Sequence, residues 1–270
     1  MSFDSISDRG LVILGCGRMG GAILQGLLQG GLPAKSVWVI TPHPSDWLQA
    51  SGVHLNTDLP ENPAVVLLAV KPQMMAESLL QLSKMPTGDT LFVTVAAGIT
   101  MEGYARMLGD QTRLVRAMPN TPSAIGRGVT AIVGNSKATE QDLDIAQELM
   151  SGVGQVVRLE NEEQINAVIG VSGSGPAYVF HLIEVMAAAG EAEGLAPDLA
   201  LQLAKATVGG AGALAEQSDE TPSKLRENVT SPGGTTAAAL NVLMDPDTGM
   251  APLMRRAVAA NIARNRELGK

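Results

Sequence analysis

Three glycines near the start of the chain lie at a G-x-G-x-x-G spacing. Gly15, Gly17 and Gly20 follow the apolar run 11–14, and apolar residues continue at helical intervals over 21–28. This order of strand, glycine turn and helix is the context in which the fingerprint binds a dinucleotide. The first glycine permits the tight turn, the second lets the backbone approach a pyrophosphate, and the third lets helix and strand pack closely. A turn without a ligand is the alternative, but this placement favours a cofactor site at the helix N-terminus.

The end of the next predicted strand bears on which dinucleotide is bound. The apolar run 36–40 stops at Thr41, and no Asp or Glu between 40 and 44 could accept hydrogen bonds from the ribose 2′-hydroxyl of NAD. The hydroxyls of Thr41 and Ser45, with the charge of Arg18, could instead bind a 2′-phosphate. The pattern therefore favours NADP, with NADPH preferred and NADH as the second candidate. The alternative for both hydroxyls is that they cap the next helix.

Two further apolar runs, 64–70 and 91–95, are typical of parallel strands buried on both faces of a sheet. The first ends at Lys71 and the second ends in the loop 96–98. Ligands of open α/β sheets bind at the carboxyl ends of strands, so Lys71 is expected in the cofactor cleft rather than as a solvated lysine.

A stiff loop follows the predicted strand 113–117, because two prolines fix φ on either side of Asn120. This loop could present Asn120 to a substrate or to the nicotinamide amide. The alternative is a turn into the strand 128–133. A helix over 139–150 and a strand over 155–159 would complete an α/β domain.

From 162 onward the strand pattern does not return. Protein domains have about 150 residues on average, so the length of the chain, 270 residues, suggests two domains. We place them at 1–161 and 162–270. The small residues and proline of 172–176 would kink a helix, and they suit a close helix crossing or a ligand wall equally. Further helices are predicted over 164–170, 179–190, 197–215 and 250–268.

The segment 197–215 is apolar on all sides, with Lys205 as its only charged residue after Asp198. A helix of this kind must be buried all round, and we expect a second subunit to cover it.

The densest group of polar residues is 228–236, directly before the helical pattern 237–243. Hydroxyls and glycines at a helix N-terminus make an anion site of the right size for a carboxylate. The alternative is an ordinary helix start capped by Thr235 or Ser231. Nine consecutive non-helical, mostly polar residues are more than one cap requires, which favours the anion site.

Composition excludes several classes of protein. Of the 270 residues 45% are hydrophobic, while the net charge of −8 and the 3% of aromatic residues argue against a nucleic-acid partner. Cys16 is the only cysteine and the three histidines are scattered, so no metal site is expected. Neither a signal peptide nor an uninterrupted apolar stretch of about 18–20 residues is visible, so we expect a cytoplasmic protein with no membrane partner.

Five motifs resemble those of pyrroline-5-carboxylate reductases, in the right order over nearly the whole chain. The most specific is the polar stretch that ends at Thr236, and the least specific is the glycine fingerprint. The motifs occupy 15–20, 69–72, 116–122, 172–178 and 231–236.

The resemblance implies a Rossmann-like domain with a mostly parallel sheet, followed by an all-α domain through which subunits dimerise. Some family members assemble further into decamers. The implied reaction is reduction of 1-pyrroline-5-carboxylate to proline by NAD(P)H. The cofactor contacts would fall on Gly15, Cys16, Gly17, Arg18, Met19, Gly20, Thr41, Asn56, Val70, Lys71, Pro72, Ala97 and Asn228.

The implied substrate contacts lie mainly in the second half, where the Thr236 hydroxyl would face the ring nitrogen as the catalytic group. Asp219 stands where relatives place a Glu near the substrate. No His or Cys is placed as a strong acid, and His181 is expected to pack within a helix. A cyclic imine can arrive already protonated, so positioning would do much of the catalysis. The substrate contacts would be Ser231, Gly233, Gly234, Thr235 and Thr236, with Asn120 and Ser174 as further candidates.

Three alternatives stay open at this point. A β-hydroxyacid dehydrogenase would need a G-x-x-x-N-x-x-K pattern in the helical half, and none of its three lysines follows an Asn at that spacing. A cofactor-binding protein without catalysis would have lost the motif 231–236, which is intact. Reduction of the six-membered imine differs by one methylene, worth only about 1–3 kcal/mol of discrimination.

Overall fold

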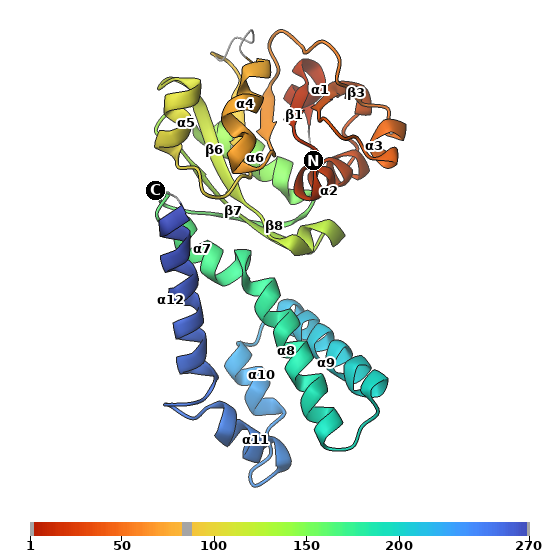
Figure 1. Ribbon diagram of the computed structural model, residues 1–270, viewed down its shortest axis with the longest axis vertical. Coiled ribbons are helices and arrows are strands. Elements are labelled where there is room, and N and C mark those ends of the chain that lie inside the picture. Colours follow the sequence, from red (N-terminus) through yellow and green to blue (C-terminus); the bar gives the residue numbers. More distant parts are fainter. Residues whose placement is uncertain (1–2, 83–87, 269–270) are drawn as a thin grey trace. The chain divides into compact units, whose positions relative to one another are not determined.

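The computed structural model describes residues 3–82 and 88–268, which form two compact units (Figure 1). Unit 1 consists of Met1–Gly173 and Ile262–Lys270, and unit 2 consists of Ser174–Asn261. Residues 162–173, which we assigned by sequence to the helical half, thus group with unit 1. The domain boundary at 161/162 stays a prediction.

Unit 1 is built on an eight-stranded sheet of order β3-β2-β1-β4-β5-β6-β7-β8. The strands from β3 to β6 are all parallel, β7 is antiparallel to β6, and β8 is parallel to β7. This confirms the predicted Rossmann-like α/β fold. The strands are β1 (Leu11–Leu14), β2 (Val37–Ile40), β3 (His54–Leu55), β4 (Val65–Leu68), β5 (Leu91–Thr94), β6 (Arg113–Met118), β7 (Gly128–Gly134) and β8 (Gly154–Arg158).

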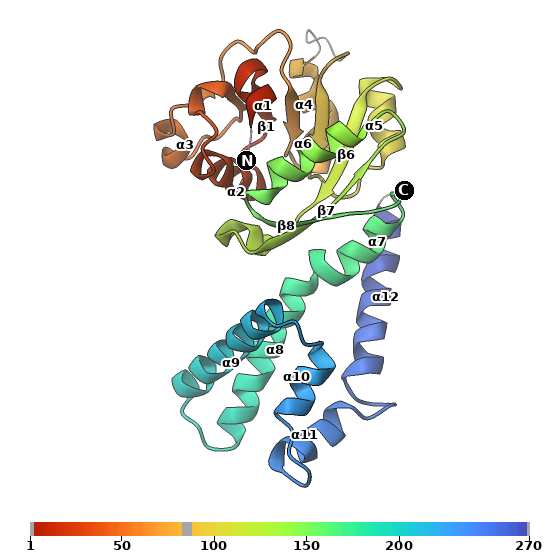
Figure 2. The ribbon, with the colours of Figure 1, turned by 180° about the vertical axis from the view of Figure 1, so that it is seen from behind.

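Helices cover both faces of this sheet, which explains why its central strands are continuous apolar runs. Alternate residues of a strand point to opposite faces, so Ile13 packs on the side of α2 and α6, while Val12 packs on the side of α4 and α5. Figure 1 shows α4 and α5 on one face, and Figure 2 shows α6 on the other. The α-helices of unit 1 are α1 (Asp4–Arg9), α2 (Arg18–Gln29), α3 (Asp46–Ala50), α4 (Met75–Leu79), α5 (Met101–Leu108), α6 (Glu140–Ser151) and α7 (Gln164–Val168).

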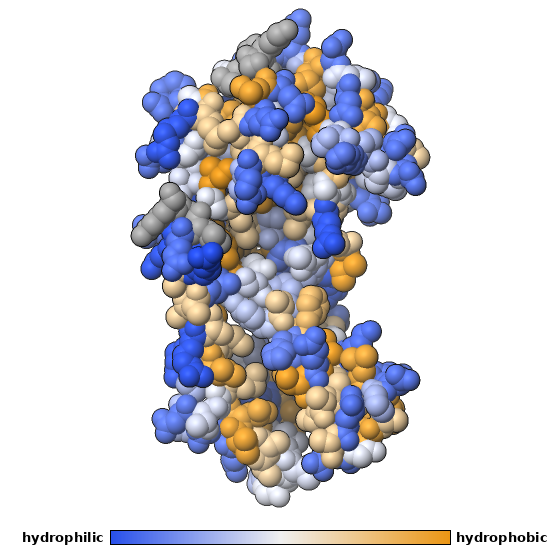
Figure 3. Space-filling view, viewed as in Figure 1, coloured by the Kyte–Doolittle hydropathy of each residue, from blue (hydrophilic) through white to orange (hydrophobic). Residues whose placement is uncertain are grey.

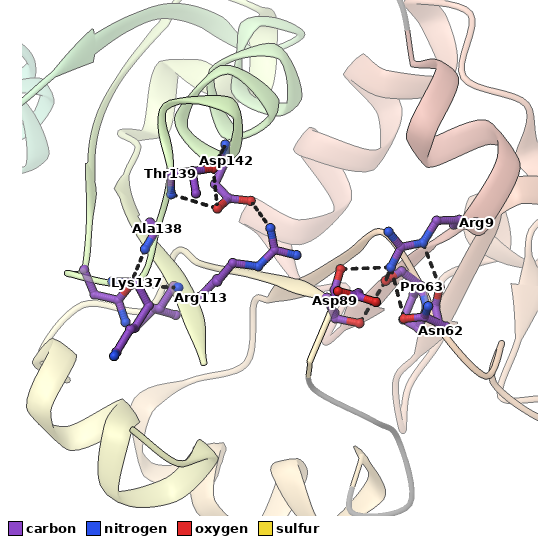
Figure 4. A network of polar contacts seen from close by, with 12 residues as sticks. Arg9, Asn62, Pro63, Asp89, Arg113, Lys137, Ala138, Thr139 and Asp142 are labelled. Carbon is purple, nitrogen blue, oxygen red and sulfur yellow. Dashed lines mark hydrogen bonds and ion pairs between the residues drawn. The ribbon is translucent and has the colours of Figure 1, made fainter. Parts of the chain in front are cut away.

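Two polar networks fix the ends of these elements (Figure 4). Arg9 donates hydrogen bonds to the backbone oxygens of Pro63 and Asp89, at 3.1 and 2.9 Å, and so ties α1 to the segments that precede β4 and β5. Asp142 accepts from the backbone N–H of Thr139 at 2.8 Å, closing a capping box at the start of α6. The same carboxylate pairs with Arg113 of β6 at 2.9 Å.

Unit 2 is entirely helical, as the loss of the strand pattern after 162 predicts. Helices α8 and α9 pack through small residues, with Ala187, Ala200 and Ala204 buried. A five-residue π-helical turn, Ile169–Gly173, precedes α8 at the motif expected to kink a helix. The helices are α8 (Gly175–Ala192), α9 (Pro197–Gln217), α10 (Pro222–Asn228), α11 (Thr235–Leu243) and α12 (Met250–Leu268), whose last residues group with unit 1.

Large apolar side chains of α8 and α9 are exposed on this chain. Phe180 of α8 is 59% exposed, and Leu201 and Leu214 of α9 are 45% and 58% exposed. Figure 3 shows hydrophobic patches on the surface of unit 2. Helix α9 therefore has apolar side chains all round, as predicted, but nothing in the described part of this chain covers most of them.

The helical run Gln164–Ala192 is, within the described residues, the one segment whose length and composition would allow it to cross a membrane. Its best window has a mean hydropathy of 1.2, and 6% of that window is buried. The sequence expectation counted only uninterrupted apolar stretches, and polar residues such as Ser172 and Glu184 interrupt this one. An exposed apolar helix of this length is equally typical of a subunit interface.

Candidate cofactor and substrate site

The glycine turn after β1 has the geometry that the fingerprint requires. Gly15 has a φ of +91°, and a Cβ there would lie 2.6 Å from Cγ1 of Val70. A Cβ at Gly20 would lie 2.5 Å from the backbone oxygen of Gly15. A Cβ at Gly17, by contrast, would meet no atom of the described residues within 4 Å. The first and third glycines are therefore needed for the turn itself, while the second borders open space.

Gly17 is also the N-cap of α2, and it offers no side chain to the first N–H groups of that helix. Those groups, with the positive end of the helix dipole, are suited to a pyrophosphate. The open cradle at Gly17 therefore fits the phosphates of a dinucleotide, and Arg18 and Met19 begin the helix that would hold them.

The strand order brings the other predicted cofactor residues to the same edge. Strands β1 to β3 follow one another toward one edge of the sheet and strands β4 to β8 toward the other, so the strand order reverses between β1 and β4. Doubly wound sheets bind ligands at such a switch point. Thr41 follows β2, Lys71 follows β4, and Ala97 follows β5, so all three lie at the carboxyl ends of parallel strands. Lys71 and Ala97 are exposed there.

A cavity of about 950 Å³ lies beside the glycine turn at this edge. Its lining includes Thr41, Asn56 and Val70, three of the predicted cofactor residues. Three acidic residues, Asp58, Glu61 and Glu77, also line it. The cavity is therefore suited to the adenosine half of a dinucleotide, with negative charge in its walls.

Asn56 shapes this cavity from a left-handed backbone conformation, with φ of +52°. Its Oδ1 accepts a hydrogen bond from the Thr41 N–H at 2.9 Å, and its Nδ2 donates to the Thr41 oxygen at 3.0 Å. Ser45 is the N-cap of α3 and accepts from the Leu48 N–H at 3.3 Å, so for Ser45 the capping alternative is confirmed. Thr41 is buried and does not cap that helix.

Cys16 lies half-buried inside the glycine turn. Desolvation raises the pKa of its thiol to about 11, so the side chain stays neutral near pH 7. A neutral thiol is a poor nucleophile, which agrees with a role in shaping the loop rather than in covalent chemistry.

Asn120 uses its amide within unit 1. Its Nδ2 donates to the backbone oxygen of Ser172 at 3.1 Å, and its Oδ1 accepts from the Val129 N–H at 2.9 Å. The side chain thereby joins β7 to the π-helical turn. Its contact with a ligand stays a prediction, and the alternative of a turn into β7 describes its local role.

The polar stretch 228–236 is shorter outside helices than the sequence indicates. Asn228 ends α10 and Thr235 begins α11, so only six residues, 229–234, are non-helical. The expectation of nine was wrong because helix boundaries cannot be read from polar residues alone. The N-cap of α11 is Gly234, and no side chain of the described residues caps it, so the alternative of a helix start capped by Thr235 or Ser231 is not borne out.

The shorter non-helical stretch removes one argument for an anion site at α11, while the missing side-chain cap supplies another. Gly233 has a φ of +70°, and the Gly234 N–H donates to the Ser231 oxygen at 3.0 Å, which forms a tight turn before the helix. Thr236 is the second helical residue. The first N–H groups of α11 are therefore not engaged by a side-chain cap.

The remaining predicted residues of unit 2 have partners within that unit. Ser174 precedes α8, and its Oγ accepts from Nδ2 of Asn261 at 2.8 Å. Nδ2 of Asn228 donates to Glu220 at 2.8 Å. His181 does not pack within the helix as expected; it is exposed and its Nδ1 lies 3.0 Å from Glu184.

The structure thus brings the predicted cofactor residues of unit 1 to one edge of the sheet, while Asn228, Ser174 and 231–236 belong to unit 2. Sequence reasoning missed the acidic lining of the cavity and a partly buried ion pair between Arg116 and Glu162. An arginine within an apolar strand was the available signal for that pair. Among the described residues, no group of three or more His, Cys, Asp or Glu could hold a metal ion.

Comparisons with known proteins cover both units. A family model for pyrroline-5-carboxylate reductase dimerisation matches residues 162–268, and a model for coenzyme F420-dependent NADP oxidoreductases matches residues 10–98. A pyrroline-5-carboxylate reductase of Pisum sativum is 36% identical over 264 residues, covering 96% of this chain and 95% of that protein. The Escherichia coli (strain K12) enzyme of the same name is 35% identical over 87% of this chain and 90% of its own length.

Solved structures agree in fold over the same length. A pyrroline-5-carboxylate reductase from Coxiella burnetii superimposes with a TM-score of 0.91 at 33% identity, covering 97% of this chain and 99% of that one. The Plasmodium falciparum pyrroline carboxylate reductase, solved with NADP bound, has a TM-score of 0.80 at 24% identity, covering 98% and 99%. With the glycine turn, the sheet order and the helical unit in place, the chain belongs to the pyrroline-5-carboxylate reductase family.

Proposed function

We propose that this protein reduces 1-pyrroline-5-carboxylate to L-proline, the last step of proline biosynthesis, with NAD(P)H supplying the hydride to the ring C=N. The observation that carries the proposal is the 36% identity over 96% of the chain, which includes both the glycine turn and the helical half. The open cradle at Gly17 and the uncapped N-terminus of α11 support it, because the reaction needs one site for phosphates and one for a carboxylate.

The cofactor would be held by the residues at the carboxyl edge of the sheet. The phosphates would bind over the turn at 15–20, and the adenosine half would occupy the cavity beside Thr41 and Asn56. We propose that NADPH is preferred, because no carboxylate stands at the end of β2 to bind a free 2′-hydroxyl. NADH is the second cofactor, and the carboxylates in the cavity wall favour it.

The substrate carboxylate would bind the N–H groups at the start of α11, next to Ser231, Gly233, Gly234 and Thr235. The Thr236 hydroxyl would hydrogen-bond the ring nitrogen and orient the ring. No acid of shifted pKa is needed, because the imine can arrive protonated. Alignment of this kind can lower a barrier by about 7–11 kcal/mol in favourable cases. Asn120 would act by fixing the backbone at Ser172, and Ser174 stays a candidate contact.

The match of residues 162–268 to a dimerisation family model supports the proposal that the chain forms a homodimer through the exposed apolar side chains of α8 and α9. A second subunit, rather than lipid, would cover the run Gln164–Ala192. Assembly of dimers into decamers and a cytoplasmic location complete the proposal.

The test is oxidation of NADPH and of NADH by the purified protein, with 1-pyrroline-5-carboxylate and with its six-membered homologue. Rapid turnover of the five-membered ring is the expected result, with a higher kcat/KM for NADPH than for NADH. Tight NADPH binding without turnover of either imine would leave the fold in place and overturn the assigned reaction. Faster turnover of the six-membered ring would reassign the substrate.

A further inference from the structure

A partly buried ion pair joins β6 to the start of α5. Nη1 of Arg116 donates to Oε1 of Glu162, and the same oxygen accepts from the Met101 N–H at 2.7 Å. The Arg116 side chain is 9% exposed and that of Glu162 is 29% exposed. Met101 is the first residue of α5, so one carboxylate holds both a strand and a helix N-terminus.

A second set of hydrogen bonds, around Thr94, lies beside this ion pair on the same face of the sheet. Thr94 pairs in register with Arg116 on the neighbouring strand. Its Oγ1 lies 2.6 Å from the Tyr104 hydroxyl and accepts from the Ala96 N–H at 3.2 Å. Burial raises the pKa of Tyr104, while the charge of Arg116 acts in the opposite direction.

These two groups anchor the two ends of one short loop. Ala96 is bonded at its start, and Met101 is bonded just after its end. Between them the loop 97–100 contains Gly98 at a φ of +86°. Gly98, with Arg116 and Glu162, borders a cavity of about 530 Å³, so the middle of the loop has open space beside it. Its position therefore depends on its anchors.

This loop follows β5 at the carboxyl edge of the sheet, one strand beyond β4 on the side away from the adenosine cavity. A dinucleotide extends across that edge, so the nicotinamide half would lie against the loop that contains Ala97.

We propose that Glu162 and Arg116 are positioning residues that fix the loop 97–100 for the nicotinamide half of the cofactor. The inference rests on the proposed function. Neither residue touches the reacting atoms; the carboxylate acts through the Met101 N–H and the guanidinium acts through the carboxylate. Loss of the pair would release the end of the loop from β6 and leave it held by the Ala96 contact, the packing of Ile99 and the Thr100 cap of α5. The bound cofactor would then be held less well for hydride transfer.

The chain offers a matched control on the opposite face of the same strand. Arg113 lies three residues before Arg116 and therefore points to the other side of the sheet. Its partner Asp142, like Glu162, accepts from one arginine and from one backbone N–H, that of Thr139 (Figure 4). The Asp142 side chain is 2% exposed and also accepts from the Thr139 hydroxyl, so breaking this pair should cost at least as much stability but leave the loop 97–100 in place.

The experiment compares Glu162→Gln with Asp142→Asn. Dissociation of NADPH is measured by the fluorescence of the bound cofactor without imine, kcat and KM are measured with it, and thermal unfolding is followed for both variants. Exchange of the Met101 amide hydrogen reports on the loop directly. We expect Glu162→Gln to weaken NADPH binding and lower kcat/KM by about tenfold or more, since small misplacements of a bound reactant are costly. Asp142→Asn should lower the unfolding temperature without either effect.

Equal kinetics in the two variants, or unchanged exchange of the Met101 amide in Glu162→Gln, would overturn the inference. If Glu162→Gln does not fold, Arg116→Lys against Arg113→Lys makes the same comparison with the charges retained. Absence of imine turnover in the wild type would count against the proposed function instead, while the NADPH titration would still test the role of the pair.

Discussion

Asn56 holds Thr41 by both ends of its amide, accepting from the Thr41 N–H at 2.9 Å and donating to the Thr41 oxygen at 3.0 Å. Through this contact the short loop before β4 fixes the backbone at the end of β2, where the ribose of the cofactor is expected. The left-handed backbone at Asn56 is a conformation that asparagine tolerates better than most residues.

Replacing Asn56 should weaken binding of the cofactor without weakening binding of the imine. We expect Asn56→Ala to lose two hydrogen bonds, each worth about 0.5–1.5 kcal/mol, and to carry backbone strain as well. KM for NADPH should rise and KM for the imine should stay unchanged in steady-state assays. Asn135→Ala is the control, because Asn135 likewise accepts from the Leu114 N–H and donates to the Thr112 oxygen. This contact lies at the start of β6 and not at the carboxyl end of a strand. A rise in cofactor KM in both variants would contradict a local role for Asn56.

The carboxylates of the adenosine cavity should set the ratio of the two cofactors. Glu77→Gln removes one negative charge from the wall, so kcat/KM for NADPH should rise relative to NADH. For exposed charges the expected gain is about 0.2–1 kcal/mol, and it should shrink as ionic strength increases. Asp144→Asn, on α6 across the sheet, removes the same charge outside the cavity and should leave the ratio unchanged. A ratio that does not respond to Glu77→Gln would remove that carboxylate from cofactor selection.

The glycine turn allows folding and binding to be separated. A Cβ at Gly17 meets no described atom within 4 Å and φ there is −77°, so Gly17→Ala should fold with wild-type stability. Its methyl group should nevertheless block the approach of the pyrophosphate and raise the dissociation constant of NADPH. Gly21→Ala, inside α2, should stabilise the protein by about 0.5–1 kcal/mol without a change in binding. Urea unfolding and cofactor titration of both variants check this, and tight NADPH binding by Gly17→Ala would refute the phosphate role.

The parts of this fold that sequence predicts are those with a local physical cause. The run 64–70 is apolar because β4 is covered on both faces, and Gly15 and Gly20 stand where a Cβ would clash within the turn, while Gly17 borders open space. The pair Arg116–Glu162 was missed because it joins residues 46 positions apart, and nothing in either segment alone names the partner.

Side-chain roles were harder to predict than strands for the same reason. Asn120 offered a donor and an acceptor, but whether these face a ligand or the chain depends on where Ser172 and Val129 lie in space. His181 was expected to pack within a helix, but it is exposed. Its face of α8 is exposed on a single chain, and no local pattern says which face of a mostly apolar helix the chain itself buries.

The exposed face of α8 should be a subunit interface. Phe180→Lys places a charge where we propose apolar contact, and burial of an unpaired charge is costly. We expect the variant to sediment as a monomer at concentrations where the wild type is a dimer. Ile125, 78% exposed in unit 1, supplies the control, since Ile125→Lys should leave the mass unchanged. A dimer of Phe180→Lys with wild-type stability would exclude this face.

Thr236 should contribute to the reaction and not to cofactor binding. It is the second residue of α11, and its hydroxyl is proposed to hydrogen-bond the ring nitrogen. Thr236→Ala should lower kcat/KM by about tenfold to a hundredfold, the worth of a hydrogen bond to a charged group. The dissociation constant of NADPH should stay unchanged, and Thr236→Ser, which keeps the hydroxyl, should restore most of the activity. If alanine and serine variants both turn over the imine at the wild-type rate, the hydroxyl has no part in the mechanism, and orientation of the ring must come from the N–H groups of α11 alone.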